Sequence, residues 1–418
     1  MKKSIFLFAI ILLFNESPAQ NGWFSKATFP GTPRAAASSF LIGNDIYIGA
    51  GFRIDTLLPS SLNDFWKYNV ITDVWTAIDS LPINYGLGYA NAFAINGRGY
   101  VFGGSVDSMM SQFTNQHVWE YDTATTNWVQ KNDVPFVPEF NNPSFAIDSF
   151  GYVNLSFLLS NSIYKYNPTI DIWTLMPDSF ASLVLWSVNG SSSISDSTHG
   201  YLFGGPGITV GNCQWQNHIF SYNSITNSWT FVSPALHIDT CYSNGFLFLI
   251  DSVFYMGNGS SNPTGYWWWD PYYDRIFKYD MRNYTLSQLP SFPFGQSTAS
   301  NYFTINNCAY LICGAGGMNG NRTLLFCPDS ITSVNEINYS DSILVSPNPF
   351  SNALHIKSVQ PISKIIIYNS LLQSVFQLES KEAFELNFEI GNLKDGLYFI
   401  QIITQSSNSS TVKKLIKL

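Results

Sequence analysis

An eight-residue frame that begins with tyrosine recurs along the chain at nearly regular intervals. Four complete copies read YNVITDVW, YDTATTNW, YNPTIDIW and YNSITNSW, and a degenerate copy reads YDMRNYTL; they start at Tyr68, Tyr121, Tyr166, Tyr222 and Tyr279. In each copy Asn or Asp follows the tyrosine and polar turn formers fill the middle, which predicts two strands joined by a tight turn. A unit repeated at roughly 40 to 50 residues is typical of propellers and solenoids.

A second hairpin precedes each frame. Two apolar runs flank a turn such as Asn44-Asp45 or Asn96-Gly97, residue types that tolerate the positive φ of tight hairpin turns. In most copies the second run ends in two closely spaced glycines, namely Gly49 and Gly51, Gly103 and Gly104, Gly204 and Gly205, Gly257 and Gly259, and Gly314 and Gly316. We expect these glycines to let backbones approach closely near a crowded axis. Because two hairpins make one four-stranded blade, six such hairpins predict six blades.

The sixth blade lacks an outer strand of its own. Its third strand, LLFCPD, puts Cys327 at the tyrosine position and then ends. At the other end of the chain GWFSKATFP (22–30) matches VWTAIDSLP (74–82), with Trp23 in the place of Trp75. We therefore expect strand 22–30 to complete the last blade and close the ring, which removes the free sheet edges of a linear array.

The glycine pair, Tyr-Asn or Tyr-Asp and Trp, in this order, resemble the Kelch repeat over residues 20–330. The resemblance implies an all-β fold, a six-bladed Kelch-type β-propeller. The third copy departs from the pattern with Asn154-Leu155 in place of the glycines, and the fifth and sixth copies lose the Trp and the Tyr. Those departures concern the regularity of blades three, five and six.

The N-terminal residues 1–19 have the features of a secretory signal peptide. Lys2 and Lys3 precede an apolar run from Ile5 to Phe14, and small residues lead up to Ala19. We expect signal peptidase to cut after Ala19. The apolar run is too short to anchor the chain in a bilayer, and we expect no transmembrane span elsewhere.

The C-terminal part, residues 341–418, follows a short linker at 331–340. Five β-like runs separated by turn residues predict a small β-sandwich. The motif residues Pro347, Asn348, Pro349, Gly396, Tyr398, Lys413 and Lys414 resemble the type A sorting domain of the type IX secretion system. The resemblance implies export across the outer membrane by that machinery, with the protein then secreted or held on the outer cell surface. An adhesive sandwich that stays attached is the alternative.

Composition excludes several classes of partner and site. The formal net charge is −8, with 11% charged and 16% aromatic residues, which favours a β-rich extracellular protein. No basic stripe exists to neutralise phosphates, so we expect no nucleic-acid partner. The five cysteines show no CxxC spacing, which argues against zinc. Cys313 and Cys327 fall on neighbouring strands of the sixth blade and are the pair that we expect to bridge.

Long connections between second and third strands indicate where a ligand would bind. They run over 52–63, 105–116, 206–217 and 260–274, whereas the turns on the opposite face of the disc are short. Loops on a rigid scaffold are where function concentrates. We therefore place any ligand on this long-loop face and at the mouth of the propeller axis.

The stretch GYWWWDPYYDR, 265–275, is the most distinctive part of these loops. Its aromatic residues Trp267, Trp268, Trp269, Tyr272 and Tyr273 could stack on sugar rings or anchor a protein partner. Asp270, Asp274 and Arg275 would be their polar complements. The alternative is that the tryptophans fold back to cover the edge of the blade.

The residue four positions before each tyrosine opens the third strand beside these loops. The set is Asp64, His117, Ser162, His218 and Arg275, which could converge on a polar ligand or could be ordinary polar strand ends. Galactose oxidase, a Kelch propeller, binds copper through two His and a Tyr cross-linked to Cys. No clustered set of these types exists here, so we predict no metal and no cofactor.

Catalytic chemistry is less well supported by the sequence than binding. Several loop aspartates are present but no spacing selects a pair, and no GxSxG, HExxH or P-loop motif occurs. Sialic-acid mutarotases, which are also Kelch propellers, resemble the chain in blade number and export, and here Arg275 or Arg53 with Glu139 or an Asp offers the only route to that chemistry. We predict an exported monomer that binds a glycan or protein, with no catalytic residue assigned. The alternatives are a mutarotase-like or oxidase enzyme and a purely structural adhesin.

Overall fold

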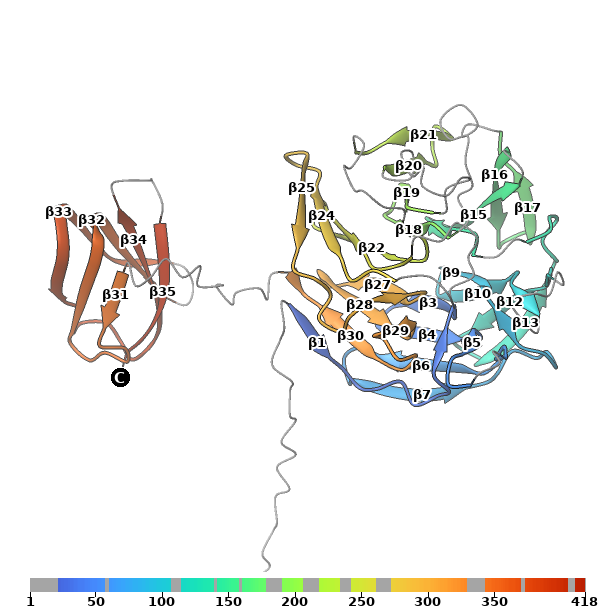
Figure 1. Ribbon diagram of the computed structural model, residues 1–418, viewed down its shortest axis with the longest axis horizontal. Coiled ribbons are helices and arrows are strands. Elements are labelled where there is room, and N and C mark those ends of the chain that lie inside the picture. Colours follow the sequence, from blue (N-terminus) through green and yellow to red (C-terminus); the bar gives the residue numbers. More distant parts are fainter. Residues whose placement is uncertain are drawn as a thin grey trace, which may run out of the picture. The chain divides into compact units, whose positions relative to one another are not determined.

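The computed structural model describes twelve segments of the chain. They are 22–56, 60–106, 114–138, 141–157, 160–177, 190–205, 218–233, 242–260, 272–328, 343–369, 373–404 and 410–417. The chain divides into two compact units, Met1–Ile331 and Thr332–Leu418 (Figure 1). Within the described segments all regular structure is β, and no helix there is long and apolar enough to cross a membrane. The predicted signal peptide and linker lie outside the described residues.

The first unit contains six four-stranded antiparallel sheets, the blades. From inside to outside, blade one is β3 (Ser38–Ile42), β4 (Asp45–Gly49), β6 (Phe65–Asn69) and β7 (Val74–Ile78), and blade two is β9 (Asn91–Ile95), β10 (Arg98–Phe102), β12 (Val118–Asp122) and β13 (Asn127–Lys131). Blade three is β14 (Ser144–Ile147), β15 (Phe150–Phe157), β16 (Ser160–Asn167) and β17 (Ile172–Leu175), and blade four is β18 (Ser192–Ser195), β19 (His199–Phe203), β20 (Ile219–Asn223) and β21 (Ser228–Phe231).

Blades five and six complete the ring. Blade five is β22 (Phe246–Ile250), β23 (Val253–Gly257), β24 (Ile276–Asp280) and β25 (Thr285–Leu289), and blade six is β27 (Asn301–Ile305), β28 (Cys308–Ile312), β30 (Thr323–Phe326) and β1 (Trp23–Ser25). The inner strands contact one another in the cycle β3, β9, β14, β18, β22, β27 and back to β3. The predicted six-bladed propeller is therefore confirmed (Figure 1).

Three small two-stranded sheets flank the blades. They pair β2 (Arg34–Ala35) with β5 (Phe52–Arg53), β8 (Leu87–Gly88) with β11 (Ser105–Val106), and β26 (Ser297–Thr298) with β29 (Ala315–Gly316). Each of these small sheets pairs the segment that precedes a blade's inner strand with the segment that follows the second strand of the same blade. Both ends of the blade's inner hairpin are thus fixed at the long-loop face.

The repeated tyrosine frame folds as its residues predict. Tyr68 stands opposite Trp75 in the pairing of β6 with β7, and their ring centroids lie 4.8 Å apart. The Tyr68 hydroxyl donates to Asp73 Oδ1 at 2.5 Å, and Asn69 Oδ1 accepts the N–H of Thr72 at 2.9 Å. The same contact from tyrosine to the last turn residue recurs in Tyr166–Asp171 and Tyr222–Asn227, each at 2.7 Å. The tyrosine therefore buries its ring and fixes the turn with one hydroxyl.

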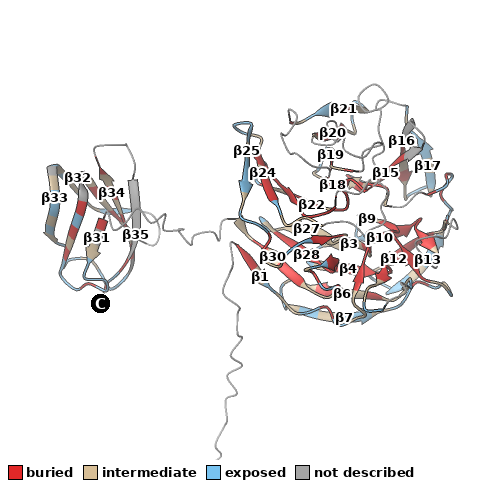
Figure 2. Cartoon of the chain, viewed as in Figure 1, coloured by how far each residue is buried: buried red, intermediate tan, exposed pale blue. Residues whose placement is uncertain are grey.

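Burial follows this layering. Figure 2 shows that the second strands, such as β4, β19 and β23, are the most buried layer, whereas the outer strands β7, β13, β17 and β25 are partly or fully exposed. The aromatic residues of the second and third strands pack between neighbouring blades. One such contact places Tyr47 of blade one 5.5 Å from Tyr121 of blade two, centroid to centroid.

The ring closes through the N-terminal strand. Strand β1 pairs with β30, with Trp23 opposite Phe326 and Ser25 opposite Leu324. Trp23 is only 3% exposed, and its ring lies 4.8 Å from that of Phe326 and 5.0 Å from that of Phe292. Since Tyr68 faces Trp75 in blade one, the tyrosine position of blade six holds Phe326. The assignment of Cys327 to that position was wrong by one residue.

The disulfide differs from the predicted pair. Cys308 is bonded to Cys327, and Cys313 is a free, buried thiol. The antiparallel register explains the difference, because Ala309 stands opposite Phe326 and the next pair outward is Cys308 with Cys327. Cys313 lies beyond the other end of β28, and burial raises the pKa of its thiol to about 12.

The glycines after the second strands lie at a backbone bend that recurs in five blades. In some blades the bend involves other residues than the glycine pairs expected from the sequence. Five blades place two successive residues with positive φ after the second strand: Ala50-Gly51, Gly103-Gly104, Gly204-Gly205, Asn258-Gly259 and Cys313-Gly314. The second residue is always glycine, with φ between 86° and 113°. The N–H of Gly51 donates to Leu87 O in the next blade at 2.6 Å, and that of Gly314 to Arg34 O at 2.9 Å. Glycine here joins one blade to the next.

Blade three departs from the others as its sequence predicts. Strands β15 and β16 continue through Asn154 and Leu155 as one hairpin, with Leu155 opposite Ser162 and Phe157 opposite Ser160. No glycine bend interrupts this pairing. Blade three therefore has a longer hairpin where the other blades have a bend and a loop.

The second unit is a single five-stranded sheet. It contains β31 (Ile343–Ser346), β32 (Ala353–Asn369), β33 (Ser374–Glu389), β34 (Gly396–Thr404) and β35 (Ser410–Lys417). Strand β32 pairs with β31 along its first part and with β34 along its second, and its register shifts between Lys357 and Ile362. Buried Ile356, Ile367 and Ile400 share one core. The small β domain that the sequence predicts is thus one sheet bent at bulges.

Trp23 should contribute most of the stability of ring closure. We expect Trp23→Ala to lower the free energy of unfolding by about 3–5 kcal/mol, because it empties a buried aromatic site on a strand of three residues. Urea unfolding followed by circular dichroism measures this. The matched control is Val74→Ala on the corresponding outer strand β7, where the side chain is 52% exposed and the change should stay within about 0.5 kcal/mol. Equal stability of the two variants would contradict the closing role.

Candidate functional site

A cavity of about 190 Å³ lies on the propeller axis. Its lining comes from the segments that lead into the inner strand of every blade: 36–39, 89–92, 141–144, 191–193, 244–245 and 299–303. These segments precede the inner strands or form their first residues, and the antiparallel second strands end on the same side. The cavity, called the axial pocket below, therefore opens on the long-loop face. All six blades contribute to its wall.

The rim of the axial pocket is a ring of residues with left-handed backbone conformation. One residue from each blade takes part, with φ between 50° and 74°: Ala36, Tyr89, Asn141, Gly190, Asn244 and Ala299. Main-chain hydrogen bonds link neighbours in the ring, including Tyr89 N–H to Ala36 O at 3.1 Å and Ala299 N–H to Asn244 O at 2.8 Å. A non-glycine residue in this conformation costs about 1–3 kcal/mol, and such strain clusters at functional sites.

The wall of the pocket is polar but uncharged. Its amides belong to Asn91, Asn141, Asn142, Asn244 and Asn301, and its hydroxyls to Ser39, Ser144, Ser191, Ser192, Ser193 and Ser300. Among the described lining residues none is Asp, Glu, His, Lys or Arg. A pocket of this kind compensates the lost hydration of a neutral polar ligand and leaves an ionic ligand without a counter-charge.

Side chains from neighbouring blades fix the wall in place. The inner strands are sheet edges, and their carbonyls accept hydrogen bonds from the next blade. Ser193 Oγ donates to Ser144 O at 3.0 Å, and Ser144 Oγ donates to Ala92 O at 3.3 Å. Asn301 Nδ2 donates to Ala37 O at 2.7 Å, across the boundary of blades six and one. The polar groups of the wall are therefore positioned by the fold itself.

Tyr302 reaches past the inner strand of blade five at the inner end of the pocket. It comes from blade six, yet its hydroxyl accepts the N–H of Ser193 in blade four at 2.7 Å and donates to Ser193 O at 3.2 Å. The corresponding position in other blades holds a small residue such as Ser39, Ala92 or Ser144. Burial raises the pKa of Tyr302 to about 12, so it is a neutral phenol at physiological pH.

The predicted strand-opening residues do not come together. Each lies at the start of a third strand and is bonded within its own part of the ring: Asp64 Oδ2 to Arg34 at 2.7 Å, His117 Nδ1 to Asp133 at 2.9 Å, and His218 Nδ1 to Ser233 O at 3.2 Å. Arg275 is exposed. In the described chain none of them lines the axial pocket.

Asp64 belongs to a structural ion pair. Arg34 is fully buried, donates to Asp64 Oδ2, and also donates to Ala50 O at 3.0 Å. Burial opposes ionisation of Asp64, but the hydrogen bond and charge of Arg34, helped by the Trp66 indole, hold its pKa below the usual value. Asp64 therefore stays ionised and fixes Arg34.

The Trp-rich stretch is only partly described. Trp267, Trp268, Trp269 and Asp270 lie outside the described residues. Tyr272 packs against the rim cluster that contains Ala36, Tyr89 and Ala299. Tyr273 N–H donates to Gly259 O at 2.8 Å, and Tyr273 O accepts the N–H of Ser297 at 3.1 Å. The stretch therefore ends at the rim of the axial pocket, with Asp274 and Arg275 leading into β24.

Sequence reasoning placed a ligand at the axis mouth but missed the residues that form it. The rim residues differ in type and share only their backbone conformation. A weak signal was present, since Asn, Ser, Ala or Gly run just before the inner strands, as in Ala90-Asn91-Ala92, Asn141-Asn142 and Ser243-Asn244-Gly245. Small polar residues in six equivalent places would have indicated a lined channel.

The pieces of the predicted sorting motif meet at strand β35. Asn348 Oδ1, between the two prolines Pro347 and Pro349, accepts the N–H of Ile416 at 2.9 Å. Tyr398, two residues after Gly396 on β34, stands opposite Leu415 and donates its hydroxyl to Lys394 O at 2.7 Å. Lys413 and Lys414 lie on β35 itself. Motif segments that are far apart in the sequence thus lie together at strand β35.

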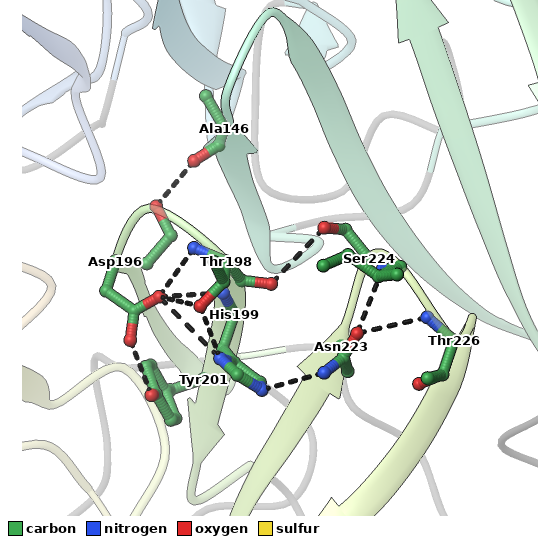
Figure 3. Close-up of polar contacts among 10 residues, drawn as sticks. Ala146, Asp196, Thr198, His199, Tyr201, Asn223, Ser224 and Thr226 are labelled. Atoms are coloured by element: carbon green, nitrogen blue, oxygen red, sulfur yellow. Dashed lines mark hydrogen bonds and ion pairs between the residues drawn. The ribbon is translucent and has the colours of Figure 1, made fainter.

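A second polar cluster lies on the short-turn face of blade four (Figure 3). Asp196 accepts the N–H groups of Thr198 and His199 and the hydroxyl of Tyr201, each at 2.7 Å. His199 Nε2 lies 3.1 Å from Asn223 Nδ2, so the cluster joins two turns. Asp196 and His199 therefore connect these two turns. In the described chain no group of three or more His, Cys, Asp or Glu side chains could hold a metal ion.

The Asp196 turn gives a pH-dependent contribution to stability. Burial would raise the pKa of Asp196, but hydrogen bonds from Tyr201, Thr198 and His199 lower it below the usual value. Because the carboxyl has a lower pKa in the folded protein than in the unfolded chain, where it is about 3.9, it stabilises the fold at pH values above the unfolded pKa. This contribution is lost as the pH falls through the folded-state pKa. We expect Asp196→Ala to lose about 1–2 kcal/mol at pH 7 and to approach wild type as the pH falls through the lowered pKa of the carboxyl.

Urea unfolding at several pH values measures this difference. Exposed Asp79, for which Asp79→Ala should change stability by less than about 0.5 kcal/mol, is the control. A difference between Asp196→Ala and wild type that does not change with pH would contradict the role of the carboxylate.

Comparisons with known proteins match the two units separately. Residues 344–418 match the family model described as the secretion system C-terminal sorting domain. The Kelch-like protein terF of Aspergillus terreus is 25% identical over 187 residues, which are 39% of this chain and 39% of that protein. The N-acetylneuraminate epimerase of Shigella sonnei is 28% identical over 158 residues, 38% of this chain and 39% of that protein. The matches thus span about two fifths of the length of these curated relatives.

The solved structures agree in fold. The structure of YjhT superposes with a TM-score of 0.57 at 16% identity, covering 73% of this chain and 98% of that one. At this identity the likeness speaks for the fold alone. The sorting-domain match marks a protein that the type IX system exports to the cell surface or the medium. The chain is a six-bladed Kelch-type β-propeller that carries a C-terminal type IX secretion sorting domain.

Proposed function

We propose that the protein is an exported, non-catalytic binding protein whose axial pocket takes a small, neutral, hydroxyl-rich group, a sugar residue of a glycan. The observation that carries this proposal is the composition of the pocket wall: asparagine and serine from six blades, with no charged side chain among the described lining residues. Asn and Ser can each donate and accept, and a sugar hydroxyl does the same.

The size of the pocket favours a sugar residue over a protein segment. A volume of about 190 Å³ is below the usual range for drug-sized ligands, roughly 300–1,000 Å³, and equals roughly six water molecules. Protein partners are instead recognised over large surfaces of roughly 800 Å² per partner. The wall is also held by hydrogen bonds between blades, so little ordering is needed on binding.

An enzyme like the epimerase relatives is the second candidate, and their names favour it. N-acetylneuraminate is an anion, and acid–base chemistry needs titratable groups within hydrogen-bond reach of the ligand. The described wall offers only tyrosines of this kind, and burial raises the pKa of both Tyr302 and Tyr89. Arg53 is paired with Asp55 at 2.8 Å, and Glu139 lies outside the described residues. Polarimetry on fresh N-acetylneuraminate tests this: faster equilibration with the protein would favour the enzyme.

Rim asparagines should control affinity for a neutral glycan. We expect Asn141→Gly with Asn244→Gly to weaken binding by at least about tenfold, because two amides that donate and accept are lost. Glycine keeps the positive φ of both sites, 50° and 56°. The matched control is Asn306→Gly, which also has φ 50° but lies exposed in a turn on the opposite face.

Binding is measured by calorimetry on the neutral oligosaccharides that an array identifies. The control variant should bind within about twofold of wild type. Equal affinity of the rim variant and the control would contradict a ligand in the axial pocket.

The Trp-rich stretch is proposed as the outer part of the same site. Because the stretch ends at Tyr272 on the pocket rim, we expect Trp267→Ala/Trp268→Ala/Trp269→Ala to weaken glycan binding by about 30-fold, the loss typical of an aromatic anchor. Array binding together with the melting temperature separates lost contacts from lost folding. Unchanged binding would contradict the assignment of the three tryptophans, and with them Asp270 and Arg275, to the binding site.

A further inference from the structure

The axial pocket is a dead end, and we infer that it accepts the end of a saccharide chain and excludes its interior. This inference rests on the proposed function, because it specifies which part of a glycan the pocket takes. Three features of the described residues support it: the wall, the floor and the depth.

The wall surrounds the pocket on all sides. Each of the six blades contributes residues, so the described part of the wall forms a ring and leaves no groove between blades along which a chain could run. Main-chain hydrogen bonds join the rim residues, for example Gly190 N–H to Asn141 O at 2.9 Å and Ala36 N–H to Ala299 O at 3.1 Å. Lateral opening would require these bonds to break.

Tyr302 closes the inner end. Its side chain runs from blade six past blade five to blade four, where its hydroxyl is hydrogen-bonded to the main-chain N–H and carbonyl of Ser193. The ring packs near Phe248, with centroids 6.1 Å apart. The residues that line the pocket go no farther along the inner strand of blade six than Tyr302 and Phe303. We infer that Tyr302, among the described residues, blocks the passage of a chain toward the short-turn face.

The depth admits a terminal residue only. Tyr302 is three residues beyond the rim residue Ala299, so the pocket is at most roughly 10 Å deep even if these residues were fully extended. An interior sugar carries glycosidic bonds on two sides, so both neighbours would need a path out of the pocket. A terminal sugar needs one path, and the pocket has one mouth.

The experiment compares chemical forms of one neutral hexasaccharide that wild-type protein binds. The probes are maltohexaose and chitohexaose, each free, immobilised through the reducing end, or capped at the non-reducing end with a 4,6-benzylidene acetal, and α-cyclodextrin as a chain without ends. Blocking one end should weaken binding by at least about tenfold, and blocking the other should leave it within about twofold.

Binding that neither cap weakens, or α-cyclodextrin binding as tightly as maltohexaose, would overturn the inference while leaving the proposed function standing. Binding to none of these or of the array's neutral saccharides would instead refute the proposed function, and this inference with it.

Variants of the floor provide a second test. Tyr302→Ser installs the residue found at this position in other blades, such as Ser39 and Ser144, and opens the floor. It should lower the tenfold preference for a free end, whereas Tyr302→Phe keeps the ring and should retain the preference. The same end preference in Tyr302→Ser, with the melting temperature showing a folded protein, would contradict the assignment of Tyr302 as the floor.

Discussion

Main-chain hydrogen bonds between neighbouring blades hold the centre of this propeller, and they depend on backbone conformations that few residues adopt without strain. One set begins at glycines after the second strands, as in Gly51 to Leu87, and another links the rim residues, as in Tyr89 to Ala36. Both sets need positive φ. The bonds after the second strands use glycine at the positive φ. The rim bonds place residues such as Ala36 and Tyr89 there, each at a backbone strain of about 1–3 kcal/mol. The same strain that joins the blades shapes the mouth of the axial pocket.

The fold was predictable because its signals are local and repeated. Tyrosine, turn and tryptophan recur within eight residues, so one hairpin specifies the others, and the match of Trp23 to Trp75 indicates how the ring closes. The errors occurred where the repeat degenerates. Without a tyrosine to set the register, the sixth blade was misaligned by one residue, and Cys327 was assigned to Cys313 instead of Cys308.

The candidate site was less predictable for two physical reasons. Residues at the same place in each repeat, such as Asp64, His117 and His218, looked convergent in the sequence, but third strands lie away from the axis and each side chain finds a partner nearby. The rim has the opposite character, because its residues, from Ala36 to Gly190, resemble one another only in φ. Composition cannot show a shared conformation, and the central wall emerges only when six blades are assembled.

Ring closure also implies an order of assembly. Trp23 and Phe326 lie at opposite ends of the propeller sequence, so their pairing is non-local and we expect it to form after the local hairpins. Cys308 and Cys327 are separated by only 19 residues, and their disulfide joins strands that already form one hairpin-like unit. The Cys327 N–H then donates to Gly22 O at 3.0 Å, directly beside β1. Oxidation in the periplasm or outside the cell can thus form the disulfide before β1 pairs with β30. The strand edge that β1 binds is then already fixed.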